Sequence, residues 1–184
     1  MNELPPEIRG AREKWRYSGQ RRPDFAREPG PGQESVWDYP RPPCLNPDTR
    51  FIEVARSGVT VAKTRRAVRM LETASPPTFY LPPEDVSIEY LEKSRCTSIC
   101  EWKGTASYWS LRLGDMTLRD VAWSYEDPSP GFESISGYLS FYPARVDCFV
   151  DGFKVDPQPG RFYGGWVTPE VVGPFKGEPG SEWW

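Results

Sequence analysis

Short runs of alternating apolar and polar residues, each ended by turn-forming residues, constrain this chain more than any other feature. From Ser107 the alternation is regular, with Trp109, Leu111 and Leu113 on one face and Gly114-Asp115 as the turn that follows. A period of two is the pattern of a half-buried β-strand. Because 21 prolines and 16 glycines interrupt the 184 residues, we expect helix to be a minor component.

Two segments before this run predict a hairpin and a short helix. FIEVAR and TVAKT are β-favouring runs on either side of Ser57-Gly58, which suits a hairpin turn. Thr64 can cap a helix in which Val68 and Leu71 have the spacing i, i+3, and Ser75-Pro76-Pro77 ends it.

Further strands are predicted on both sides of the regular run. Residues 86–91 (VSIEYL) alternate, and GYLSFY, VDCFV and FKV are β-favouring runs. The apolar phase slips by one residue between Leu118 and Val121, which predicts a β-bulge near Arg119-Asp120.

These elements indicate a mainly β protein with a single compact domain of short antiparallel strands, a sandwich or open barrel with one or two short helices. We expect the core domain over 48–155. Residues 1–47 contain nine prolines and predict an N-terminal arm that is partly docked through aromatic rings such as Trp37, the alternative being a disordered tail. The Gly/Pro/aromatic segment 156–184 is predicted to cap the core.

Several classes of function are excluded by composition and motif. The chain has no histidine, which removes His-dependent triads and His metal ligands. A net charge of −3 argues against a nucleic-acid partner. No segment approaches the ~20 apolar residues of a membrane span, and MNELPPEIRG lacks the apolar run of a secretory signal. We therefore expect a cytoplasmic protein with no membrane partner. Phosphate-loop and dinucleotide-binding signatures are absent from the sequence, and no cofactor is expected.

The four cysteines are expected to be reduced, since a cytoplasmic location disfavours disulfides. Cys96 and Cys100 have a spacing that supplies two zinc ligands, but Cys44 and Cys148 are isolated and form no second pair. We therefore expect no metal site.

Titratable groups and rings gather in a few patches along the chain. Glu72 falls at the end of the predicted helix, where its negative charge interacts unfavourably with the helix macrodipole. A role in function would explain why a carboxylate stands there. We predict Glu72, Asp85 and Lys103 as catalytic groups that work without histidine if burial tunes Glu72 or Lys103 toward neutrality. The predicted ligand-binding rings are Tyr80, Trp109, Trp123, Tyr125 and Tyr142. The alternative for each is ordinary: a surface Glu, an Asp that caps its turn, a paired Lys and a core Trp109.

In order, these patches resemble a known family. They are the Glu before prolines, the turn Tyr80-Leu81-Pro82-Pro83-Glu84-Asp85, Lys103-Gly104 before an aromatic strand, Ala122-Trp123-Ser124-Tyr125 and Phe141-Tyr142-Pro143. Over about 50–155 the chain resembles the domain of unknown function DUF427, which some catalogues label nucleotidyltransferase-like. ESVWDYPRPP and GGWVTPEVVGPFKGEPG resemble its longer bacterial members. The resemblance implies a compact, mostly β fold. Nucleotidyl transfer needs paired carboxylates that hold Mg²⁺, and no spacing here supplies them.

Two functions remain. One is a small-molecule site, catalytic or ligand-sensing, in which the carboxylates and the lysine lie under an aromatic wall. The other is a noncatalytic protein-binding or scaffold module that acts through the aromatic arm and tail, and it requires exposed tryptophans. The sequence leaves assembly into a homo-oligomer open.

Overall fold

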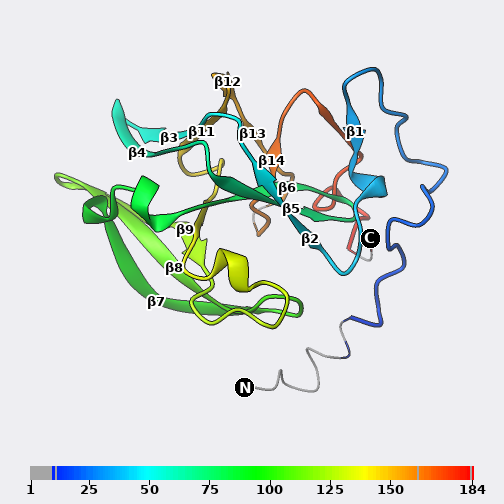
Figure 1. Cartoon of the computed structure of the whole chain (residues 1–184), viewed down its shortest axis with the longest axis horizontal. Coiled ribbons are helices and arrows are strands. Elements are labelled where there is room, and N and C mark those ends of the chain that lie inside the picture. Colours follow the sequence, from blue (N-terminus) through cyan, green and yellow to red (C-terminus); the bar gives the residue numbers. More distant parts are fainter. Residues whose placement is uncertain (1–9, 11, 161, 183) are drawn as a thin grey trace.

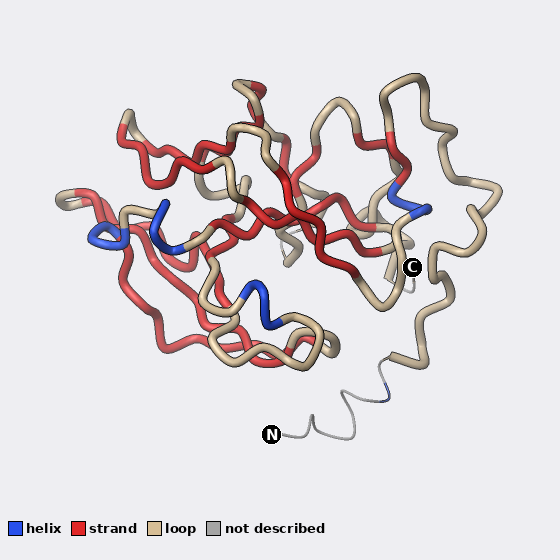
Figure 2. Tube along the Cα trace, in the orientation of Figure 1, coloured by secondary structure: helices blue, strands red, loops and turns tan. Residues whose placement is uncertain are grey.

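In the computed structural model, strands make up the body of the chain, and between residues 34 and 172 the described helix is confined to short 3₁₀ turns (Figure 1, Figure 2). The structure describes residues 10, 12–160, 162–182 and 184. The expected mainly β class is confirmed: the described strands form several antiparallel sheets in one compact domain, without a closed barrel. None of the helical turns in these residues has the length and apolar character needed to cross a membrane. The strands are β1 (Glu34–Ser35), β2 (Cys44–Asp48), β3 (Ile52–Arg56), β4 (Val59–Thr64), β5 (Ala67–Glu72), β6 (Ser75–Leu81), β7 (Leu91–Cys100), β8 (Gly104–Leu113), β9 (Met116–Ser124), β10 (Leu139–Phe141), β11 (Asp147–Val150), β12 (Phe153–Lys154), β13 (Asp156–Pro157), β14 (Trp166–Val167) and β15 (Val171–Val172). The 3₁₀ turns are η1 (Val36–Asp38), η2 (Pro83–Asp85), η3 (Ile88–Tyr90) and η4 (Glu133–Ile135).

Two sheets enclose the main core. The larger has the order β2-β5-β6-β10-β9-β8-β7, and the smaller has the order β12-β11-β3-β4. Val54 and Val150 of the smaller sheet belong to one buried cluster with Phe79, Leu81 and Leu111 of the larger. The apolar faces of the two sheets therefore pack against each other. Tyr80 and Trp123 belong to a second buried cluster. Because neighbouring side chains on a strand point to opposite faces, Tyr80 places this second cluster on the other face of the larger sheet.

The two predicted hairpins and the bulge are confirmed. β3 turns into β4 at Ser57-Gly58, and β8 turns into β9 at Gly114-Asp115. Trp109 pairs with Ala122 whereas Leu111 pairs with Leu118, so extra residues of β9 lie between these pairs. Asp120, inside the bulge, has a φ of 50°.

The helix predicted to end before Ser75 is wrong. Residues 67–72 form β5, which pairs with β2 on one side and with β6 on the other. Ala74, with a φ of 69°, lies in the tight turn to β6. Pairing with two neighbouring strands decides this segment, and the i, i+3 spacing of Val68 and Leu71 is too short to outweigh it.

The strand predicted over 86–91 is also wrong. η3 takes up Ile88–Tyr90, and Ile88 is 39% exposed. Val86 is buried in the main core and forms an isolated bridge with Ala62, while Tyr90 and Leu91 pack against that core partly buried. The segment crosses from β6 to the start of β7, so residues 87–90 have no neighbouring strand with which to form a ladder, and pairing begins at Leu91, opposite Leu111.

The arm and the tail pack on the domain and on each other. β1 of the arm pairs in parallel with β15 of the tail. The Trp37 indole is fully buried, and its Nε1 donates to the carbonyl of Pro174, 3.1 Å away. β2 begins at Cys44 and forms an edge of the larger sheet, so the strand runs across the predicted boundary at residue 47.

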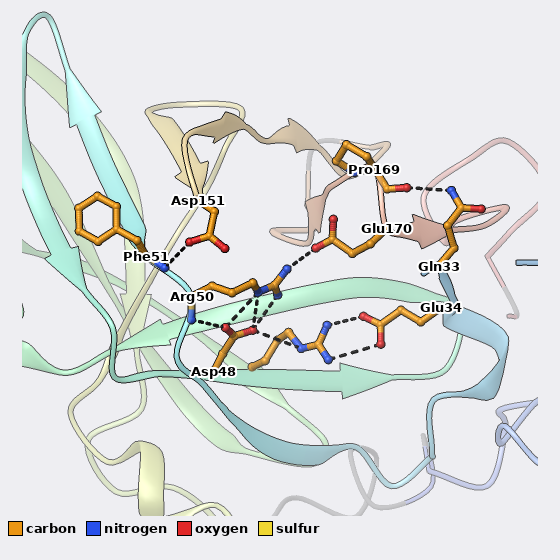
Figure 3. A network of polar contacts seen from close by, with 9 residues as sticks. Gln33, Glu34, Asp48, Arg50, Phe51, Asp151, Pro169 and Glu170 are labelled. Carbon is orange, nitrogen blue, oxygen red and sulfur yellow. Dashed lines mark hydrogen bonds and ion pairs between the residues drawn. The ribbon is translucent and has the colours of Figure 1, made fainter. Parts of the chain in front are cut away.

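An ion-pair network ties these parts together (Figure 3). Arg50 contacts the Asp48 carboxylate, 2.7 Å away, and the Glu170 carboxylate of the tail. Arg69 of β5 contacts Glu34 of the arm, and its Nε lies 3.7 Å from Asp48. Arm, sheet and tail therefore meet at two arginines that share the buried Asp48.

Candidate functional site

A cavity of about 330 Å³ lies on the face of the larger sheet that carries Tyr80 and Trp123. Strands β5, β6, β7, β8 and β9 contribute its floor. Trp15 of the arm and the tail segment from Gln158 to Lys176 contribute the rest of its wall. The cavity is therefore assembled from three parts of the chain.

Packed rings form one wall of the cavity. The Trp123 and Tyr142 ring centroids lie 4.5 Å apart, and the Tyr80 ring meets Trp123 edge-on at 6.2 Å. Trp123 Nε1 donates to the Tyr80 hydroxyl, 3.2 Å away. Burial raises the pKa of Tyr80, Tyr125 and Tyr142 above the ordinary value, so these phenols remain protonated at neutral pH. The wall is aromatic and uncharged.

Lys103 brings a buried ammonium to this wall. It lies in the turn between β7 and β8 and is 7% exposed. Its Nζ lies 3.5 Å from Met70 Sδ and 5.6 Å from the centroid of the Tyr125 ring. Burial opposes the charged form, but the interactions of the ammonium with Cys100, Tyr80 and Glu72 outweigh it, and the pKa of Lys103 is raised. Lys103 therefore stays charged, and the expectation that burial tunes it toward neutrality is wrong.

Glu72 reaches the cavity from the end of a strand, so the helix-dipole argument for it does not apply. Its Oε1 lies 3.3 Å from Nε of Arg41. The buried Arg41 guanidinium also donates to the carbonyl oxygens of Tyr17 and Thr73 and lies over the Trp15 ring, 4.5 Å from its centroid. Glu72 is thus a paired carboxylate, and the Arg41 side chain that pairs with it is itself fixed by two hydrogen bonds.

Lys176 of the tail is the second buried ammonium of the cavity, and sequence reasoning missed it. Its backbone N–H donates to the Ala74 carbonyl, and its own carbonyl accepts from Gln158, each at 2.7 Å. The next residue, Gly177, has no room for a side chain, because a Cβ at this position would lie 1.9 Å from the Pro159 carbonyl oxygen.

The surroundings of Lys176 Nζ are less favourable to charge. Nζ lies 3.3 Å from the centroid of the Trp15 ring and donates to the Trp184 carbonyl, 3.1 Å away. Burial and the positive charge of Arg41 lower the pKa of Lys176 to about 8, although Glu72 and Glu101 oppose this shift. At mildly basic pH this amine can accept a proton within the cavity.

The structure brings six of the eight predicted site residues into the cavity: Glu72, Lys103, Tyr80, Trp123, Tyr125 and Tyr142. Asp85 is not among the lining residues. It pairs with Arg66, 2.8 Å away, and accepts from Thr64, and the Arg66 bond holds the pKa of Asp85 low. Asp85 therefore lies outside the cavity, where its ion pair with Arg66 holds the turn.

Trp109 is also not among the lining residues. It packs against the main core, and its Nε1 donates to the Ser124 hydroxyl, 2.9 Å away. Its alternation with Leu111 and Leu113 in the sequence agrees with this position on the core, outside the cavity.

Besides Lys176, other lining residues come from segments that sequence reasoning did not assign to a site. They include Trp15, Tyr163, Gln158, Tyr108, Cys100 and Glu101. Glu101 accepts from Trp15 Nε1, 3.0 Å away. Cys96 is exposed while Cys100 lines the cavity, and the described residues hold no group of three or more Cys, Asp or Glu that suits a metal ion.

The tryptophans of the arm and tail pack inward. Trp37 and Trp166 are fully buried, and Trp184 stacks on Phe25 with ring centroids 5.0 Å apart. Trp183 lies outside the described residues. Residues 1–9, which the sequence predicts not to form a secretory signal, also lie outside them. The described tryptophans therefore do not form the exposed patch that a partner-binding arm and tail would need.

Comparison with protein families gives a match for this chain. The model of a family described as a domain of unknown function (DUF427) matches residues 44–152. No curated protein matches the chain. The matched stretch contains Glu72, Lys103 and the ring wall, and it leaves Trp15 and Lys176 outside.

Proposed function

The chain belongs to the DUF427 family, and on that premise we propose that it binds a small molecule in the cavity, in a catalytic or ligand-sensing role. The observation that carries the proposal is the buried Lys103 ammonium beside an uncharged aromatic wall. Small-molecule sites combine mostly apolar walls with a few fixed polar groups, and their volumes begin at ~300 Å³. The free cysteines are consistent with a cytoplasmic location as part of the same proposal.

The cavity also offers the groups that acid–base work requires. Glu72 is held by Arg41, and Lys176 has a pKa of about 8, lowered by burial and by Arg41. Lys176 can exchange a proton with a bound molecule, Glu72 adds a carboxylate, and Lys103 supplies fixed positive charge. The alternative, a scaffold that acts through its aromatic arm and tail, is less well supported because Trp37 and Trp166 are buried.

A thermal-shift screen against nucleotides, sugars, small acids and divalent metals tests the proposal. A ligand that binds the native state raises the unfolding midpoint. We expect at least one class to do so in the parent chain, and Glu72→Gln or Lys103→Met to abolish the shift.

Asp85→Asn and Lys63→Met are matched controls, because both residues lie outside the cavity. They should keep the ligand shift. The proposal fails if no class stabilises the parent chain, or if the controls lose the shift as completely as the cavity variants.

A further inference from the structure

The two carboxylates that line the cavity have polar partners within the protein, whereas the Lys103 ammonium has no oxygen partner in the described residues. Glu72 is paired with Arg41, and Glu101 accepts from Trp15 Nε1. Lys103 Nζ, by contrast, has sulfur and a ring for neighbours: Met70 Sδ at 3.5 Å, the Cys100 thiol and the Tyr125 ring. Within the described chain, no carboxylate lies within 4.0 Å of Nζ and no oxygen accepts a hydrogen bond from it.

An ammonium carries three N–H donors and is best satisfied by oxygen acceptors. Sulfur is a weak acceptor, so the donors of Lys103 are poorly used. Burial without such acceptors is costly for a charged group. An anionic oxygen from a ligand would form the short, charge-assisted hydrogen bonds that the protein itself does not provide.

The second ammonium of the cavity favours the same sign of ligand charge. Lys176 donates to the main-chain oxygen of Trp184 and lies on the Trp15 ring, and no Asp or Glu side chain in the described residues lies within 4.0 Å of its Nζ. Both side-chain carboxylates that line the cavity are already engaged, and neither ammonium group has an Asp or Glu partner in the described part of the chain. The field in the cavity therefore suits an anion.

The walls define the rest of the ligand. Trp123, Tyr125 and Tyr142 present ring surfaces beside Lys103. Phe162 and Ile99 also line the cavity and are 71% and 46% exposed, so apolar side chains stand where the cavity meets solvent. A volume of about 330 Å³ lies at the small end of ligand sites and suits one or two rings.

We infer that the ligand is a planar acid of one or two rings, whose carboxylate or phosphate binds Lys103 Nζ and whose ring lies against the Trp123 and Tyr125 wall. The inference rests on the proposed function, because it names the ligand class of the same cavity.

Calorimetric titration with a charge-matched pair of probes tests it. Indole-3-acetate and indole-3-acetamide have nearly the same shape, but only the first is an anion. In the parent chain we expect the acid to bind at least about tenfold more tightly than the amide, as ~1.4 kcal/mol of charge-assisted bonding would give. In Lys103→Met the two should bind within about threefold of each other. Lys63→Met, the same substitution at an exposed lysine, should keep the parent ratio.

Phenyl phosphate, titrated in parallel, distinguishes the two sources of charge. Tighter binding than indole-3-acetate assigns the site to a phosphate, and weaker binding assigns it to a carboxylate. Equal binding of acid and amide in the parent chain overturns the inference whatever the variants do, and so does a preference for the acid that survives in Lys103→Met. If these acids fail to bind while a neutral compound shifts the unfolding midpoint, the inference is overturned and the proposed function stands. If nothing binds in either experiment, both fail.

Discussion

Two buried lysines share one cavity, and their surroundings shift the pKa of each in opposite directions. Around Lys103, the interactions of the ammonium with Cys100, Tyr80 and Glu72 outweigh burial and raise its pKa. Around Lys176, burial and the charge of Arg41 prevail and lower the pKa to about 8. The cavity therefore combines a permanent cation with an amine that titrates near neutral pH.

The pH dependence of stability is the first prediction at the residue scale. In the unfolded chain Lys176 keeps its ordinary pKa of 10.5, whereas in the folded chain its pKa is about 8. Between these values the unfolded chain holds a proton that the folded chain has released, so stability rises with pH. We therefore expect the free energy of unfolding of the parent chain, measured by urea titration, to rise with pH above pH 8. Its slope should exceed that of Lys176→Met by up to about 1.4 kcal/mol per pH unit.

The other groups that face Lys176 Nζ are Arg41, Glu72, Glu101 and Tyr163. Arginine and carboxylates do not change charge between pH 8 and 10, and burial raises the pKa of Tyr163. The comparison with Lys176→Met therefore isolates the lysine. Identical pH slopes for the two chains would show that Lys176 is not perturbed.

At the scale of single elements, the bulge in β9 is the feature under backbone strain. Asp120 has a φ of 50°, a conformation in which glycine is free and β-branched residues are disfavoured. We expect Asp120→Gly to leave the free energy of unfolding unchanged or to raise it, and Asp120→Val to lower it by about 1–2 kcal/mol. Urea denaturation of both variants measures this.

Both substitutions at position 120 remove the same carboxylate, so each is the control for the other. A common loss in the glycine and valine variants would assign the effect to the carboxylate and not to the backbone.

Local signals in the sequence predict local elements well. The hairpins at Ser57-Gly58 and Gly114-Asp115 depend on short turns and alternating neighbours, and the phase slip of β9 marks its bulge directly. β5 was predicted as a helix because its partners β2 and β6 are not evident from its own residues. Residues 86–91 alternate like a strand, yet residues 87–90 have no neighbouring strand to pair with.

The site residues likewise fall into those that local motifs indicate and those that only the tertiary fold brings to the cavity. Residues of the matched domain, such as Lys103 and Trp123, are recognisable because their motifs lie within short segments. Lys176 reaches the cavity only because the tail folds back and its N–H donates to Ala74, and no spacing within GPFKG indicates that contact. Asp85 follows a motif residue, Tyr80, by five positions, but the turn at η2 directs it to Arg66 instead.

At the scale of the whole molecule, the network around Asp48 holds the arm and the tail to the sheet. The Asp48 side chain is 8% exposed and serves both Arg50 and Arg69. We expect Asp48→Asn to lower the free energy of unfolding by about 2 kcal/mol, because it leaves two arginines without their shared anion. It should also speed limited proteolysis of the arm and tail.

Asp147→Asn is the matched control for this prediction. Asp147 also forms an ion pair, with Lys154 at 2.6 Å, but that pair is solvent-exposed and is expected to contribute at most ~1 kcal/mol. If Asp147→Asn costs as much as Asp48→Asn, the shared buried carboxylate has no special role.

The parallel pairing of β1 with β15 has a consequence for how the protein is made. Glu34 lies beside Val171, so the arm finds its partner strand only after residue 171 has been synthesised. The matched domain, with its sheet and Lys103, leaves the ribosome between the arm and the tail. Lys176, which the tail carries, follows later still. A chain stalled before residue 171 lacks both β15 and Lys176, so the ligand site is completed only when this part of the tail has emerged.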